Sequence, residues 1–170
     1  DKNRFEILES WKDKVEVIEV EFLDKPNLQK FKKRFDVAYY LMHSMSVSIG
    51  DFEEKESRAA EHFKIYMNAS TVRQIIYLTG IVNESENLSA HLESRLGVEN
   101  ILNSCKAPLT ALRAGIIVGS GSASFEIIRD LAEKLPVMIT PKWLNTKCQP
   151  ISIRNVIQYL TGVLMHEECF

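Results

Sequence analysis

The sequence predicts an α/β protein in which helices cover both faces of a parallel sheet. The main observation is Pro108–Ser122, PLTALRAGIIVGSGS, an almost uninterrupted apolar run that ends abruptly in Gly119, Ser120 and Gly121. A strand buried on both faces of a parallel sheet has this pattern. In addition, apolar runs of strand length alternate with helical patterns along the chain, which is typical of right-handed βαβ units.

Length and composition agree with one globular domain. At 170 residues the chain has room for one core and is too short for two, so we expect residues 1–170 to form a single domain. Its 45% apolar and 26% charged residues are ordinary for a soluble protein. The net charge of −2 gives no reason to expect a nucleic acid or a membrane as partner.

The cysteines and the start of the chain favour a cytoplasmic location. Cys105, Cys148 and Cys169 are odd in number, widely spaced and outside any CxxC pair. They indicate reduced thiols rather than a disulfide framework or a zinc site, and we expect no metal. No basic and then apolar leader opens the chain, and its apolar runs fall short of the roughly 20 residues that span a bilayer.

The first predicted strand is Val15–Phe22, where apolar residues alternate with glutamates. A turn and a short helix, Leu28–Arg34, lead to a second strand, Asp36–Met42, which has no polar alternation. A long helix, about Phe52–Ala69, follows with one apolar stripe. The remaining predicted elements are, in order, a strand Gln74–Leu78 closed by Thr79-Gly80, a helix Leu88–Cys105, a strand Pro108–Val118, a helix Ser124–Lys134, short strands Val137–Ile139 and Gln149–Ile151, and a helix Ile153–Met165.

Five segments carry a family resemblance that runs from about Asp1 to Leu164. They are VEVIEVEFLD from Val15, DVAYYLMHSM from Asp36, QIIYLTG from Gln74, LRAGIIVGSG from Leu112 and QPISIRNV from Gln149. In order and spacing they resemble the atypical and extended short-chain dehydrogenase/reductase group, particularly members close to nucleoside-diphosphate-sugar epimerases and NmrA-like proteins. The resemblance implies a Rossmann-type, doubly wound parallel sheet that binds NADP or NAD.

One feature of that group is absent from the sequence. Its members carry a glycine-rich loop, commonly GxxGxxG, in the first βα turn, where backbone amides approach the pyrophosphate. Here Gly50 is the only glycine in the first 79 residues. We therefore expect the N-terminal strand-helix-strand with this loop to be missing, as in a fragment of a longer protein. The missing first strand would pair with Asp36–Met42, so we do not expect residues 1–170 alone to fold natively.

The resemblance assigns cofactor contacts to the ends of the first two predicted strands. Glu21 would accept a hydrogen bond from the adenine amino group and Phe22 would pack on the ring; the alternative is a solvent-facing strand end. His43, Ser44 and Met45 would pass the ribose and nicotinamide. His43 would donate to a ribose hydroxyl or act as an acid near neutral pH, or be a structural hydrogen-bonding residue.

The third and fourth strand ends complete the predicted site. Thr79 and Gly80 occupy the place of the group's catalytic serine or threonine, where Thr79 would orient a substrate carbonyl or simply be a turn residue. Ala114, Gly115 and Ile116 would lie against the nicotinamide, with Gly115 allowing close backbone approach.

His91 and Arg95 replace the group's Tyr-x-x-x-Lys on the following helix. Their four-residue spacing places both on one helical face. His91 would relay a proton and Arg95 would bind ribose or phosphate. Three interpretations remain open: an altered active site, a cofactor fold that has lost its reaction, or a surface pair.

The resulting hypothesis is an NAD(P)-binding oxidoreductase or epimerase-like protein that acts on a small carbonyl or hydroxyl substrate. The alternative is a non-catalytic, NmrA-like dinucleotide-sensing or scaffold protein. We expect residues 136–170 to contribute to the substrate side of the pocket. By analogy with the group, the predicted helices 52–69 and 88–105 would form a homodimer.

Overall fold

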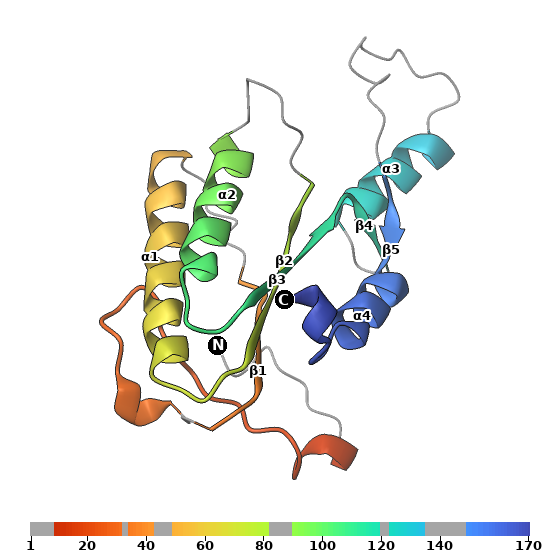
Figure 1. The fold of residues 1–170 in the computed structure, drawn as a ribbon. Helices are drawn as coiled ribbons and strands as arrows, with labels where there is room; N and C mark the ends of the chain where they lie inside the picture. Colours follow the sequence, from red (N-terminus) through yellow and green to blue (C-terminus); the bar gives the residue numbers. More distant parts are fainter. Residues whose placement is uncertain (1–8, 32–33, 43–48, 82–89, 120–122, 135–148) are drawn as a thin grey trace.

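The computed structural model describes residues 9–31, 34–42, 49–81, 90–119, 123–134 and 149–170 (Figure 1). Its main sheet has three parallel strands in the order β1-β2-β3, formed by Val37–Tyr40, Gln74–Gly80 and Leu109–Ala114. Helix α1 (Ile49–Asn68) follows β1 in the chain, and α2 (Ala90–Asn103) follows β2. This order of parallel strands and helices confirms the predicted fold class.

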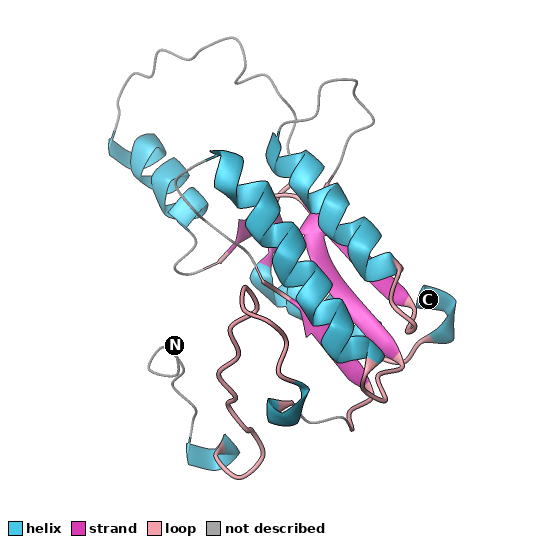
Figure 2. Cartoon of the chain, turned by 90° about the vertical axis from the view of Figure 1, so that its left-hand side faces the viewer, coloured by secondary structure: helices cyan, strands magenta, loops and turns pink. Residues whose placement is uncertain are grey.

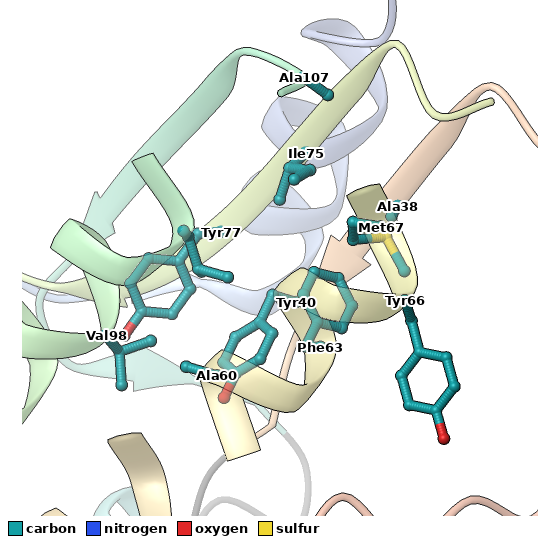
Figure 3. Close-up of a cluster of buried hydrophobic side chains, with 11 residues drawn as sticks. Ala38, Tyr40, Ala60, Phe63, Tyr66, Met67, Ile75, Tyr77, Val98 and Ala107 are labelled. Atoms are coloured by element: carbon teal, nitrogen blue, oxygen red, sulfur yellow. The ribbon is translucent and has the colours of Figure 1, made fainter. Parts of the chain in front are cut away.

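Helices α1 and α2 pack side by side on one face of the sheet, as both views show (Figures 1 and 2). Side chains alternate along each strand, so every second residue of β1 and β2 points toward these helices. The Tyr40 ring meets Phe63 at a centroid distance of 4.9 Å and Tyr77 at 5.6 Å, both edge to face. The core on this face consists of Ala38, Tyr40, Ala60, Phe63, Tyr66, Met67, Ile75, Tyr77, Val98, Leu102 and Ala107 (Figure 3).

The C-terminal segment packs on the opposite face of the sheet (Figure 1). Helix α4 (Ile153–Gly162) approaches β1, where Tyr39 Oη donates a hydrogen bond of 2.8 Å to the carbonyl of Leu160. At the start of β2, the side chain of Gln74 bonds to the backbone of Val163 and of Met165. The main sheet therefore lies between two layers.

A smaller parallel sheet pairs β4 (Ile117–Val118) with β5 (Ile151–Ser152), and helix α3 (Ala123–Lys134) lies between them in sequence. The prediction of one continuous strand over Pro108–Val118 is wrong, because the chain breaks after Ala114. At the break a Cβ on Gly115 would lie 2.4 Å from the carbonyl oxygen of Gln149. The segment that leads into β5 therefore passes close to the chain at this point.

The prediction of a strand at Val15–Phe22 is also wrong. A strand needs a hydrogen-bonded neighbour, and no part of the chain that the structure describes pairs with this segment. Its apolar residues divide between solvent and core: Ile18 is 39% exposed, whereas Phe22 packs on the rings of Phe63 and Tyr66.

Other boundaries differ by less. The predicted helix Leu28–Arg34 is a single 3-10 turn at Leu28–Lys30, and α4 ends three residues early. The predicted strand Val137–Ile139 lies outside the described residues. No described helix is long and apolar enough to cross a membrane.

Candidate functional site

A cleft of about 710 Å³ opens at the carboxyl ends of the three main strands. Ligands bind at this edge in open α/β sheets. Helix α4 supplies its opposite wall through Ile153, Val156, Ile157 and Leu160. Six of the predicted site residues line the cleft together, namely Thr79, Gly80, Arg95, Ala114, Gly115 and Ile116.

Strand register explains how residues distant in sequence meet at the cleft. Thr79 lies opposite Arg113 and Gly80 opposite Ala114 in the β2–β3 pair, so both strands end at the same level. A Cβ at Gly80 would make only an ordinary 3.8 Å contact with Leu92. Gly115, by contrast, has a structural reason to be glycine, because a Cβ there would meet the carbonyl oxygen of Gln149. The absence of a side chain at Gly115 is thus explained without a ligand, and its contact with the nicotinamide stays a prediction.

Arg95 brings a positive charge to an otherwise apolar wall. It lies on α2 and is only 8% exposed. Burial lowers the pKa of Arg95 and the nearby Tyr40 phenol partly opposes this, but a guanidinium remains protonated in proteins. A guanidinium here is therefore able to donate to hydroxyls or anions and unable to act as a base.

Behind this wall lies a buried polar cluster formed by Tyr40, Glu56, Tyr77 and Ser94. Ser94 Oγ donates a hydrogen bond of 2.7 Å to Glu56 Oε2 and thereby ties α2 to α1. Burial raises the pKa of Tyr40, Tyr77 and Glu56 raise it further, and Arg95 lowers it. Glu56 and Arg95 thus act with opposite sign on the pKa of the same phenol.

Thr79 and Tyr77 carry buried hydroxyls that form no hydrogen bond within the described part of the chain. Thr79 is 5% exposed and Tyr77 is fully buried. Burial raises the pKa of Tyr77 to about 12, and the neighbouring Thr79 hydroxyl lowers it in part. The two hydroxyls are therefore close without hydrogen-bond geometry. A buried polar group left unpaired costs about 1–3 kcal/mol, and a ligand oxygen at Thr79 would recover this.

The other predicted residues are not placed at the cleft. Glu21 is exposed and accepts a hydrogen bond from the backbone of Leu23, and Phe22 packs against α1. Neither ends a strand or lines the cleft, so their contacts with adenine stay a prediction. The predicted residues His43, Ser44 and Met45 lie outside the described residues. The backbone of His91 belongs to the first turn of α2, one turn before Arg95, but its side chain lies outside the description.

Sequence reasoning missed the residues behind the cleft, although two signals were present. Glu56 falls on the apolar stripe of α1, four residues before Ala60 and seven before Phe63, so an acid stood where a core residue is expected. Tyr77 lies two residues before Thr79 and therefore shares its face of the strand.

Comparison with known proteins supports the fold. No protein-family profile and no curated sequence matches the chain. Among solved structures, the chain is similar to TunA, an NAD-dependent NDP-hexosamine 5,6-dehydratase involved in tunicamycin biosynthesis. The TM-score is 0.57 and the identity 15%, over 76% of this chain and 51% of that one.

It is also similar to a mutant of UDP-glucuronic acid 4-epimerase from Bacillus cereus, in complex with UDP-4-deoxy-4-fluoro-glucuronic acid and NAD. Here the TM-score is 0.66 and the identity 16%, over 88% of this chain and 55% of that one. The chain thus spans about half the length of either structure. These likenesses confirm the predicted Rossmann-type α/β fold.

Proposed function

We propose that this chain is part of an NAD(P)-binding protein of the epimerase and dehydratase kind, acting on a small carbonyl or hydroxyl substrate. The observation that carries the proposal is the convergence of six predicted residues on one cleft, where a buried cation, Arg95, accompanies the unpartnered hydroxyl of Thr79. The two solved structures of similar fold, one NAD-dependent and one in complex with NAD, support the choice of cofactor.

The residues at the cleft fit the nicotinamide half of a dinucleotide. Apolar side chains from α4 and from the ends of β1 and β2 supply a wall for a flat ring, and Thr79 supplies an unused donor. Arg95 would bind the ribose hydroxyls or an oxyanion. The bound nicotinamide would accept or return a hydride.

Within this arrangement the chain's own residues have distinct tasks. Thr79 would donate a hydrogen bond to a ligand oxygen, that of the bound cofactor or of the substrate, and so orient it. When a hydroxyl is oxidised, its proton must pass to a base as the hydride leaves, and Arg95 is unable to accept it. His91, one turn before Arg95 on α2, is the residue that we propose for this transfer.

Titration of the full-length protein with NADH and NADPH, followed by nicotinamide fluorescence, tests the proposal. We expect saturable binding, weakened about tenfold in Arg95→Lys, because a lysine keeps the positive charge but loses the planar fork of donors. The matched control is Arg113→Lys, since Arg113 is outside the cleft and pairs with Glu99 at 2.6 Å.

No saturable binding to demonstrably folded protein would contradict the dinucleotide proposal. Binding without turnover on any carbonyl substrate would favour the non-catalytic, dinucleotide-sensing alternative. In that case His91→Tyr combined with Arg95→Lys, which restores the group's Tyr-x-x-x-Lys, is the variant in which to look for gained activity.

A further inference from the structure

Tyr77 and Thr79 form a pair of hydroxyls that reaches from the core to the cleft. They are separated by one residue of β2 and therefore share one face of the strand. The Tyr77 ring extends from β2 toward α2, with its hydroxyl beside Val98 (Figure 3). Thr79 lies farther along the strand and lines the cleft. Tyr77 itself is not among the residues that line the cleft.

Both hydroxyls are buried and neither has a hydrogen-bond partner among the described residues. Folded proteins rarely leave buried polar groups in this state, so each such group needs an explanation. A threonine hydroxyl has one hydrogen to donate and two lone pairs that accept. Thr79 is therefore able to accept from the phenol and to donate to a ligand at the same time. The phenol, whose pKa burial raises to about 12, is protonated at neutral pH and is able to donate.

We propose that Tyr77 is a positioning residue that donates a hydrogen bond to Thr79 when the cleft is occupied, so that the Thr79 hydrogen points at the ligand oxygen. This inference rests on the proposed binding function of the cleft and adds a residue that does not itself touch the ligand. Because the hydroxyls lack partners in the free protein, their removal should leave the free protein as stable as before or more so, while binding becomes weaker.

The test is a double-mutant cycle in the full-length protein with NADH as the probe. Tyr77→Phe and Thr79→Val each remove one hydroxyl at nearly constant volume. We expect each single variant to bind NADH about 2- to 10-fold more weakly, the factor that one hydrogen bond of ordinary net strength contributes. The double variant should bind as weakly as Thr79→Val alone, since Tyr77 acts only through Thr79. Thr79→Ser keeps the hydroxyl. Adding Tyr77→Phe to Thr79→Ser should therefore weaken NADH binding by the same factor as Tyr77→Phe does in the wild type.

Thermal unfolding of the free variants separates this role from a structural one. The unfolding midpoint of Tyr77→Phe should equal or exceed that of the wild type. A marked decrease would show that the phenol has a structural partner and would overturn the inference. Independent, multiplicative losses of NADH affinity, or an unchanged affinity in Tyr77→Phe, would overturn it while leaving the proposed function in place. Absence of NADH binding in the folded wild type would overturn both.

Discussion

Gln74 should be one of the most stability-sensitive polar residues in the described structure. It is fully buried at the start of β2. Its Nε2 donates to Thr110 Oγ1 and to the carbonyl of Val163, both at 2.9 Å, and its Oε1 accepts from the backbone amide of Met165 at 2.7 Å. Thr110 in turn donates to the carbonyl of Cys169 at 2.7 Å. This network holds the C-terminal segment on the sheet.

Substitution of Gln74→Leu keeps the volume but removes all three bonds. The carbonyl of Val163 and the amide of Met165 are half-buried, so water restores part of their hydration. At about 1–3 kcal/mol for each buried group left unpaired, we expect a loss of about 2–4 kcal/mol in the free energy of unfolding. In a domain of this size that corresponds to a decrease of about 4–16 °C in Tm.

Urea unfolding monitored by circular dichroism measures the change as a lower midpoint at constant slope. The matched control is Gln29→Leu at an exposed position, expected within about 0.5 kcal/mol of the wild type. Thr110→Val combined with Gln74→Leu should cost less than the sum of the two single substitutions, because the residues share one network. A loss below about 0.5 kcal/mol in Gln74→Leu, no larger than that of an ordinary surface change, would refute the reasoning.

Three further predictions concern the break after β3, the core and the helices. Gly115→Ala should lower the unfolding midpoint, because its Cβ would meet the Gln149 oxygen at 2.4 Å. The control is Gly97→Ala, which has open space inside α2 and should raise stability by up to about 1 kcal/mol. Equal effects of the two substitutions in thermal unfolding would be evidence against the close approach of Gln149. Because the pKa of Tyr77 is raised from 10.0 to about 12, ionisation of this phenol leaves the free energy of unfolding unchanged below pH 10 and lowers it as the pH rises toward 12. This alkaline loss should be smaller in Tyr77→Phe, and an identical pH profile would argue against a buried neutral phenol. If copies associate through the helices 52–69 and 88–105, then Ile65→Lys, at a 44% exposed position of α1, should reduce the dimer in sedimentation analysis; a monomeric wild type would exclude this arrangement.

Local patterns alone were enough to predict most of the main sheet and its two helices. The strands at Gln74 and Leu109 are predominantly apolar runs, and α1 and α2 have helical stripes, so hydrophobic periodicity was sufficient to predict their type and approximate position. Because parallel strands present their carboxyl ends at one edge, the meeting of Thr79 with Ala114 and Gly115 followed from the fold class.

Features that depend on distant segments could not be predicted in this way. Val15–Phe22 has the alternation of a strand, but backbone hydrogen bonds come from a neighbour, and that neighbour is not specified by the segment itself. At the break after Ala114, Gly115 lies against the backbone of Gln149, which is 34 residues later in sequence.

The sequence by itself determined the order of the three main strands and of helices α1 and α2, the edge at which a ligand would bind and six residues there, because these depend on periodicity and on the handedness of βαβ units. Only the tertiary structure decided what lies behind that edge. The bond between Ser94 and Glu56, the side chain of Gln74 beneath the C-terminal segment, and the unpartnered hydroxyls of Tyr77 and Thr79 all depend on long-range packing. Hydrogen bonding is short-ranged and directional, so its pattern exists only once distant segments have been brought within about 3 Å of one another.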